Sequence, residues 1–439
     1  MRRRLGTTFQ SLTVRNYRLF ASGQLVKLIG VWMQFIAQDW LVLQLSGDSG
    51  TALGFVTALQ FTPILVLSLY GGRLADRYDK RKLLIAINAM WSLQVIMLAV
   101  LISTGVVQLW HVFVFAAVMG TVNALENPVR QSFVSELVGN TLLPNALSLS
   151  GATFNSARIV GPAVAGLIIA GFGIPPVFLI SALFSMSPLV ALLRMRPADL
   201  HRDGLPSRGE RRDASTVDGL RYVRQRFDLL LPMLMIGVIC AVGFNFGITL
   251  AVLAKTTYNT GAASFGLFTT VLAAGALGGA LASSGRRARP SVYTVLGAAA
   301  GFSALETVVG LVNGYWLVVL LLLPTGFFMI YFAQAANQRV QLGTDPAYRG
   351  RVMALYVLVF LGTTPLGGPI VGWAAERFGA PASIWAGGAL SLLTALVGLL
   401  VQLRRSGDKL TMRVRPMPRV SVVEAPAREL VGAGASTSG

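Results

Sequence analysis

The sequence predicts an all-α integral membrane protein with twelve transmembrane helices in two pseudo-symmetric six-helix bundles. Three observations support this fold class: the composition is unusually apolar, long apolar stretches recur along the chain, and basic residues concentrate in alternate connections. Of the 439 residues, 54% are hydrophobic and only 13% are charged, and the mean hydropathy is +0.65. Soluble globular domains usually contain about 25% charged residues, so a water-soluble core of this size is the poorer interpretation.

Twelve apolar stretches are long enough to cross a bilayer as helices, which takes about 20 residues. They lie at residues 18–45, 51–71, 83–104, 108–134, 143–172, 175–195, 229–254, 262–284, 291–313, 316–341, 350–375 and 380–403. The longest polar interval divides them six and six. The expected organisation is an N-terminal segment (1–17), a first bundle (18–195), a central loop (196–228), a second bundle (229–404) and a disordered tail (405–439).

The distribution of charge predicts the orientation in the membrane. The formal net charge is +19, and most of the 37 Lys and Arg residues fall in connections on the same side as both chain ends. Only Lys255 and Arg377 fall in connections on the other side. Basic connections stay in the cytoplasm, so both termini are expected to be cytoplasmic, where the anionic lipids of the membrane face the positive charge. This asymmetry explains the charge better than nucleic-acid binding, which is not expected.

Three polar or unusual segments complete the outline. Residues 1–17 lack the short apolar core and cleavage site of a signal peptide, so the first apolar stretch is expected to remain in the protein. Residues 215–227 (STVDGLRYVRQRF) predict a helix on the membrane surface. The tail after Ser406 is too polar to pack. Cys240 is the single cysteine, which excludes an internal disulfide and a thiolate metal cluster.

A short, strongly basic connection joins the second and third apolar stretches. It reads GGRLADRYDKRKL over residues 71–83 and holds two aspartates among five basic residues. The two glycines let another helix approach the second stretch closely. The eleventh stretch begins at the same membrane face, where its helix N-terminus would attract the carboxylate of Asp76. The alternative is a charged turn that sets topology and has no gating role.

Two glycine landmarks recur in the second half of the chain. Residues 278–279 repeat the glycine pair at 71–72, and GPIVG at 368–372 repeats GPAVAG at 161–166. Both repeats have the same sequence offset. A duplicated six-helix unit of this kind predicts two halves related by an axis along the membrane normal.

The basic connection resembles the signature of the major facilitator superfamily, G-x-x-x-D-R-x-G-R-K, with Asp79 in place of the usual glycine. The resemblance covers about residues 15–404 and implies two bundles around a central cavity. In that superfamily the motif's aspartate and arginines hold the two halves together on the cytoplasmic side. It implies that Asp76 does so here, with Arg77 or Arg81 as its partner. The gating positions are therefore Gly72, Asp76, Arg77 and Arg81.

Other motifs are similar to those of exporters. The fifth stretch resembles a helix signature found chiefly in exporters and antiporters, although Ala157 and Ala165 replace expected glycines. Its matching residues are Gly161, Pro162 and Gly166. The segments NYRLF, QDW, NPVRQ and RGRVM, which begin at residues 16, 38, 127 and 349, are similar to the bacterial efflux branch that contains the enterobactin exporter. The resemblance implies efflux and leaves the cargo open.

Ionisable side chains within the apolar stretches are costly and are therefore functional candidates. Asp39 lies in the outer part of the first stretch, where burial would favour proton uptake and release near neutral pH; a bond to a neighbouring helix end is the alternative. Glu126 and Arg130, four residues apart, could form a pair that lines the cavity or one that is structural. Arg158 could meet Asp39 or an anionic group of the cargo, or brace the bundle.

The tenth stretch carries aromatic and amide side chains that could line a cavity for a bulky amphipathic ligand. Ordinary helix packing is the alternative. The candidates for cavity lining are Gln38, Tyr331, Gln334, Asn337 and Arg339. Lys27 and Glu306 are weaker candidates.

The sequence contains no phosphate-binding loop, nucleophile elbow or pair of metal-binding histidines, so we expect no enzyme activity, cofactor or metal. The energy source is then an ion gradient or the cargo's own gradient. We expect a monomeric secondary transporter that exports a small amphipathic molecule, such as a siderophore, drug or metabolite, in exchange for protons, by alternating access. Import of a nutrient is the close alternative, and a membrane-embedded enzyme or a channel is the remote one.

Overall fold

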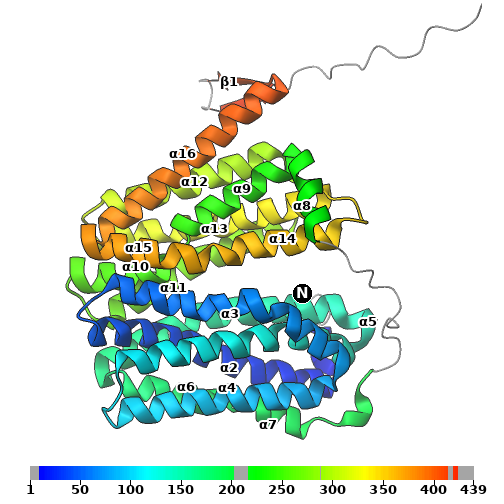
Figure 1. The fold of residues 1–439 in the computed structure, drawn as a ribbon, viewed down its shortest axis with the longest axis vertical. Helices are drawn as coiled ribbons and strands as arrows, with labels where there is room; N and C mark the ends of the chain where they lie inside the picture. Colours follow the sequence, from blue (N-terminus) through cyan, green and yellow to red (C-terminus); the bar gives the residue numbers. More distant parts are fainter. Residues whose placement is uncertain (1–8, 202–215, 287, 414–418, 424–439) are drawn as a thin grey trace, which may run out of the picture.

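The computed structural model describes residues 9–201, 216–286, 288–413 and 419–423. The helices form two bundles, which lie one above the other in Figure 1, the first in blue to green and the second in green to orange. Eleven helices within the described residues are long and apolar enough to cross a membrane. One of these helices contains two predicted crossings, so the predicted all-α fold with twelve crossings is confirmed.

The first bundle is built from six helices. They are α2 Arg15–Leu45, α3 Gly50–Arg77, α4 Lys80–Ser103, α5 Leu109–Phe172, α6 Pro175–Ser185 and α7 Ser187–Arg194, preceded by the 3-10 helix η1 Gln10–Thr13 and followed by η2 Pro197–Asp199. The side chains of Ser49 and Asp79 accept hydrogen bonds from backbone N–H groups in the first turns of α3 and α4. Such caps explain why these helices begin where they do.

The long helix α5 contains the fourth and fifth predicted crossings. Gly139 interrupts it with φ 66° and ψ 176°, a conformation that glycine adopts at little steric cost. The interval predicted to be a connection, 135–142, is therefore helical on both sides of a turn at one glycine.

The second bundle contains the remaining helices. They are α8 Thr216–Gln225, α9 Phe227–Val242, α10 Phe246–Val252, the π-helix η3 Leu253–Thr257, α11 Ala262–Ser284, α12 Val292–Leu311, α13 Tyr315–Gly343, α14 Arg349–Gly362, α15 Thr364–Phe378 and α16 Ala380–Ser406. The seventh crossing is broken at residues 243–245, between α9 and α10. Helix α8 confirms the helix predicted at residues 215–227.

The two ends of the bundles differ in what they carry. The start of α2, the helix α8 and the end of α16 share one end, called here the terminal end. The connections at residues 46–49, 258–261 and 379 lie at the opposite end, called here the far end. In Figure 1, α8 and the label of the N-terminus lie on the right and α10 lies on the left.

The glycine repeat has a structural counterpart. A Cβ at Gly71 would lie 2.7 Å from Pro128 Cγ on α5, and a Cβ at Gly279 would lie 3.1 Å from the backbone N of Tyr331 on α13. In each bundle, therefore, the second crossing packs closely on the fourth. The predicted close helix approach at this glycine is confirmed, and its partner lies in the same bundle.

The tail contains a β-hairpin. Strand β1, Lys409–Arg413, pairs in antiparallel fashion with β2, Arg419–Val423, with Lys409 opposite Val423. The prediction of a disordered tail is wrong for these ten residues. The β-branched side chains in RVSVV favour a strand, and the preceding segment is short enough for a hairpin. Residues 414–418 and 424–439 lie outside the described residues.

Candidate functional site

The interface between the two bundles is tightest at the far end, along helices α3 and α15. A Cβ at Gly50 would lie 2.5 Å from the carbonyl oxygen of Gly372, and one at Gly54 would lie 2.5 Å from that of Gly368. Only glycine leaves room for backbones this close. The glycine seam, defined as these four residues, thus joins the second crossing to the eleventh.

Polar contacts accompany the glycine seam. The Glu376 carboxylate on α15 accepts hydrogen bonds from Ser49 Oγ at 2.6 Å and from the backbone N–H of Thr51 at 2.9 Å. It therefore caps the N-terminus of α3 from the other bundle, where a negative charge is favoured. Lys255 Nζ lies 2.5 Å from Asp48 Oδ1 and 5.5 Å from the centre of the Trp40 ring. Both contacts connect the two bundles.

A second seam joins α5 to α11 and contains the residues of the predicted exporter motif. A Cβ at Gly166 would lie 3.0 Å from the Ala262 carbonyl oxygen, and one at Gly266 would lie 2.5 Å from that of Pro162. Thr270 Oγ1 donates to the Ile159 carbonyl at 3.3 Å. Gly161 instead faces α2 of its own bundle, where its Cβ would lie 3.0 Å from the Ile29 carbonyl oxygen. The motif therefore serves packing on two sides of α5.

The hydrogen bonds made by Glu376 and Thr270 and the ion pair of Lys255 all lie in the far half of the helices. Between described residues, no further ones join the bundles nearer the terminal end. Among the described residues, the polar contacts between the bundles are therefore concentrated at the far end.

The predicted gate at the terminal end is only partly described. The side chain of Asp76 and the surroundings of Gly72 lie outside the described part of the structure. Arg77 is exposed, with its guanidinium 6.0 Å from the centre of the Tyr78 ring. Arg81 Nε donates to the Leu192 carbonyl at 2.9 Å, so this side chain holds α4 to α7 within the first bundle.

Asp39 lies on α2 and faces the other bundle. It is half-buried, and its Oδ2 lies 3.8 Å from the position that a Cβ would take at Gly247 on α10. Asp39 has no hydrogen bond or ion pair with another described residue, so the alternative of a bond to a helix end is not seen. Its neighbour Gln38 is buried, at 1% exposure, rather than open to a cavity.

The predicted pairing of Glu126 with Arg130 is wrong. Glu126 Oε2 lies 2.5 Å from Lys27 Nζ, and Lys27 also donates to Asn88 Oδ1 at 2.9 Å. Arg130 donates to Asn127 at 2.8 Å instead. Lys27 and Glu126 are both buried, and a buried charge needs a partner, which the interior of the bundle supplies from a different helix. Lys27, considered a weaker candidate, is the residue that completes the pair.

Arg158 contacts an aromatic ring and not Asp39. Its guanidinium lies 5.7 Å from the centre of the Trp32 ring, and no ion pair joins it to a described carboxylate. Because Trp32 is on α2 and Arg158 on α5, this contact stabilises the packing within the first bundle.

The candidates on α13 have different surroundings. The Tyr331 hydroxyl accepts a hydrogen bond from Arg286, whose guanidinium lies 4.7 Å from the centre of the Tyr331 ring. Gln334 is exposed and Asn337 is half-buried. Arg339 donates a hydrogen bond to the Pro290 carbonyl at 2.8 Å. Its side chain therefore binds the connection between α11 and α12 at the terminal end, whereas the sequence predicted that it lines a cavity.

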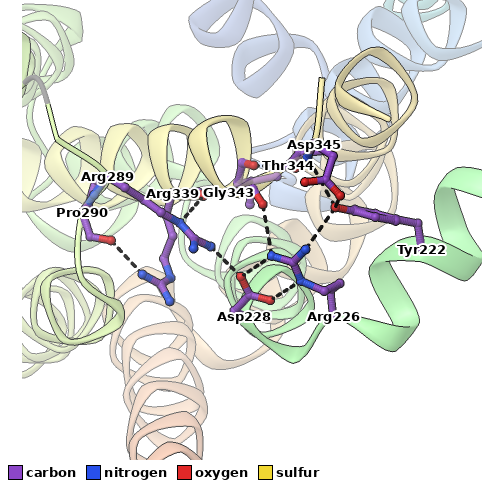
Figure 2. A network of polar contacts seen from close by, with 10 residues as sticks. Tyr222, Arg226, Asp228, Arg289, Pro290, Arg339, Gly343, Thr344 and Asp345 are labelled. Atoms are coloured by element: carbon purple, nitrogen blue, oxygen red, sulfur yellow. Dashed lines mark hydrogen bonds and ion pairs between the residues drawn. The ribbon is translucent and has the colours of Figure 1, made fainter. Parts of the chain in front are cut away.

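Figure 2 shows the polar network to which Arg339 belongs. The Asp228 carboxylate at the start of α9 forms ion pairs with Arg226, at 3.0 Å, and with Arg289, at 2.7 Å. The Asp228 carboxylate raises the pKa of Arg226 above its usual value. Tyr222 on α8 donates to Asp345 at 2.7 Å. The network therefore connects α8 to three segments of the second bundle at the terminal end.

Sequence reasoning missed three groups of residues: the Glu376 cap, the Asp48–Lys255 pair and the network in Figure 2. The interacting residues are far apart in the sequence. The one sequence feature that indicates them is the presence of Lys255 and Glu376 at the far end, where few residues are basic. Among the described residues, no group of three His, Cys, Asp or Glu side chains could hold a metal ion.

Comparison with known proteins is consistent with this architecture. A family model described as "Transmembrane secretion effector" matches residues 6–431. The chain is 26% identical to the staphyloferrin A transporter of Staphylococcus aureus, over 82% of this chain and 90% of the relative. It is 28% identical to the multidrug efflux pump Tap of Mycolicibacterium fortuitum, over 84% and 91%.

Solved structures share the fold. The nucleoside transporter NupG aligns with a TM-score of 0.70 at 11% identity, covering 88% of this chain and 99% of NupG. A bacterial homologue of the human lysosomal transporter Spinster aligns with a TM-score of 0.66 at 12% identity, covering 88% and 94%. The chain therefore belongs to the transmembrane secretion effector family of the major facilitator superfamily, and it is a multi-pass membrane transporter rather than an enzyme.

Proposed function

We propose that this transporter exports a small amphipathic molecule across the bacterial cell membrane in exchange for protons, by alternating access. The names of two relatives, a staphyloferrin A transporter and a multidrug efflux pump, support a small-molecule cargo, and the second also supports outward transport. One chain is the working unit, with bundles at residues 18–195 and 229–404 that move relative to each other.

The orientation follows from the charge. The terminal end carries the start of α2, the end of α16 and the basic connections between described helices, so it faces the cytoplasm, and the far end faces outward. The seams and polar contacts at the far end then close the outer side. The conformation is inward-facing, and the motif residues Gly72, Asp76, Arg77 and Arg81 would form the inner gate when the far-end contacts separate.

The half-buried carboxyl of Asp39 carries the proposal of proton coupling. It lies on one bundle, faces Gly247 of the other, and has no described partner that would fix its charge. An ionisable group within a membrane protein is a functional candidate for this reason. When Asp39 binds or releases a proton, the charge at the contact between α2 and α10 changes. Because α2 belongs to the first bundle and α10 to the second, this change affects the interaction between the two bundles.

Other candidates support the cargo route in this proposal. Arg130 and Arg158 are half-buried cations without a described carboxylate partner, which suits anionic groups of a cargo. Gln334 and Asn337 offer amide groups from the second bundle. Glu126 is assigned to the structure of the first bundle, because its charge is already paired with Lys27.

The test uses purified protein in liposomes with an imposed pH gradient and a panel of fluorescent amphipathic cations and siderophore-like anions. Asp39→Asn should abolish transport driven by the pH gradient, whereas exchange of cargo at equal pH should persist. Asp199→Asn, at an exposed position in a connection, is the matched control and should behave as the parent. Equal pH-driven transport by the Asp39 variant would refute the assignment, and accumulation only in right-side-out vesicles would identify an importer.

A further inference from the structure

Three buried polar atoms without hydrogen-bond partners lie on helices α12 and α16. They are Glu306 Oε2, Ser303 Oγ and Ser391 Oγ. Glu306 is 3% exposed and the two serines are fully buried. Buried polar groups almost always have partners, so a buried carboxyl oxygen without one is a candidate for a functional group or for the site of a bound species.

Glycines make room for the Glu306 carboxyl. Its Oε2 lies 2.8 Å from the position that a Cβ would take at Gly243, just after α9, and its Oε1 lies 3.8 Å from the corresponding position at Gly387 on α16. A side chain at Gly243 would collide with the carboxyl. The carboxyl therefore lies close to the backbone at Gly243 and at Gly387 of α16.

The two serines belong to the same region. Helices α12 and α16 run antiparallel, with Gly388 packed against Thr307, where a Cβ would lie 2.5 Å from the backbone N. Ser303 lies one turn before Thr307 on α12, and Ser391 lies about one turn after Gly388 on α16. Because the two helices are antiparallel, this register brings the turn of Ser303 close to the turn of Ser391. Glu306, Ser303 and Ser391 thus occupy consecutive turns of one helix pair.

No described cation lies beside Glu306. It is the one charged residue of α12, and α10 has none. The charged residues of α9 and α16 are Asp228, Arg404 and Arg405, which lie at the terminal end. Arg339 of α13 lies there too, bound to Pro290. A carboxylate without a counter-charge in this apolar setting would be strongly unfavourable, whereas a protonated carboxyl is tolerated.

The position of Glu306 relates it to the broken seventh crossing. Gly243 and Gly247 lie on either side of the break between α9 and α10, and the positions that a Cβ would take there lie 2.8 Å from Glu306 Oε2 and 3.8 Å from Asp39 Oδ2 respectively. One carboxyl is buried within the second bundle and the other is half-buried at the interface between bundles. The break is therefore bordered by two carboxyl groups that belong to different bundles.

We propose that Glu306 is a second proton-binding site and that its carboxyl is protonated in the inward-facing conformation. In this proposal, water molecules connect the protonated carboxyl to the hydroxyl groups of Ser303 and Ser391. This rests on the proposed proton coupling, which it extends into the second bundle. Loss of the proton would leave a carboxylate beside Gly243 that requires hydrogen bonds, and the break in the seventh crossing would rearrange to supply them.

The direct test is infrared spectroscopy of the whole protein in liposomes. A protonated buried carboxyl gives a C=O stretching band at neutral pH, where exposed carboxyls are ionised. Glu306→Gln should remove one such band, Asp39→Asn should affect a different one, and Glu376→Gln, at an exposed carboxyl, should remove neither. Ser303→Ala should shift the Glu306 band in a protein that folds normally. A band unchanged by both Glu306→Gln and Ser303→Ala would overturn the proposal.

A transport measurement separates this inference from the proposed function. If Glu306→Gln removes the band and pH-driven efflux falls while exchange at equal pH persists, both stand. If pH-driven efflux is intact in the parent but the band is not assigned to Glu306, only this inference fails. If the band is assigned to Glu306 but efflux never responds to a pH gradient, the proposed coupling fails and the proton site remains.

Discussion

Glu376 and Thr51 belong to different bundles, and the backbone N–H of Thr51 donates a hydrogen bond to the Glu376 carboxylate at 2.9 Å. The same carboxylate oxygen accepts a hydrogen bond from Ser49. A helix N-terminus on one bundle is thus capped by a side chain of the other. Opening of the far end must break this cap. The free energy of the cap therefore contributes directly to the equilibrium between the conformations with the far end closed and open.

Replacing Glu376 by Gln should shift that balance toward opening of the far end. The amide keeps the shape but loses the negative charge that favours a helix N-terminus, which costs about 1 kcal/mol in the conformation with the far end closed. Spin labels on Val106→Cys and Trp316→Cys, which are exposed at the far end of the first and second bundles, should report a larger population of long distances. Arg377→Gln is the control, since Arg377 is exposed and has no described contact. An identical distance distribution in both variants would show that the cap has no role in gating.

The ion pair between Asp48 and Lys255 should contribute in the same direction and be sensitive to salt. Asp48→Lys and Lys255→Asp should each favour an open far end because like charges then face each other, and the double variant should restore closure. An ion pair at this degree of exposure is worth about 0.5 kcal/mol, less at high ionic strength. The same spin-label pair measures it at low and high salt. If the double variant is as open as either single variant, the two residues do not interact during closure.

The glycine seam should be intolerant of even one methyl group. In Gly54→Ala the new Cβ would lie 2.5 Å from the Gly368 carbonyl oxygen, so α3 and α15 cannot approach as they do here. We expect a folded protein that binds cargo from the outside but transports at least about tenfold more slowly, because closure of the far end is blocked. Gly151→Ala is the matched control: it is also a helical glycine, and nothing lies within 4 Å of its added Cβ. Normal transport by Gly54→Ala would contradict a tight seam.

Much of the architecture could be predicted because it depends on local composition. Apolar stretches specify the crossings, and the glycine pairs at 71–72 and 278–279 indicate the duplicated packing of the second crossing on the fourth. The single turn at Gly139 was not predicted, because the residues on either side of it are polar enough to read as a connection. The hairpin after Ser406 was missed for a similar reason, since a short amphipathic segment in a polar tail carries little signal.

The partners of charged residues could not be predicted from local sequence. Residues four apart share a helix face, which favours a pair between Glu126 and Arg130, yet the partner of Glu126 is Lys27, far away in the sequence and on another helix. Arg339 was placed in a cavity from its neighbours on α13, yet it points to the connection at Pro290. In both cases the choice between partners is made by helix rotation within the bundle, which the sequence of one helix does not determine.

The buried pair of Lys27 and Glu126 provides a test of stability that is independent of transport. Lys27→Met leaves the Glu126 charge without its partner, and Glu126→Gln leaves the Lys27 charge without its partner, so each should destabilise the first bundle by about 3 kcal/mol. The double variant removes both charges and should recover much of that loss. Arg130→Gln is the control, since the Arg130 guanidinium donates to the uncharged side chain of Asn127 and has no described carboxylate partner, and its loss should cost about 1.5 kcal/mol. Thermal unfolding of the detergent-solubilised variants measures all four. If Arg130→Gln is as harmful as Glu126→Gln, the pairing predicted along α5 is the stabilising one and the geometry described for Lys27 is wrong.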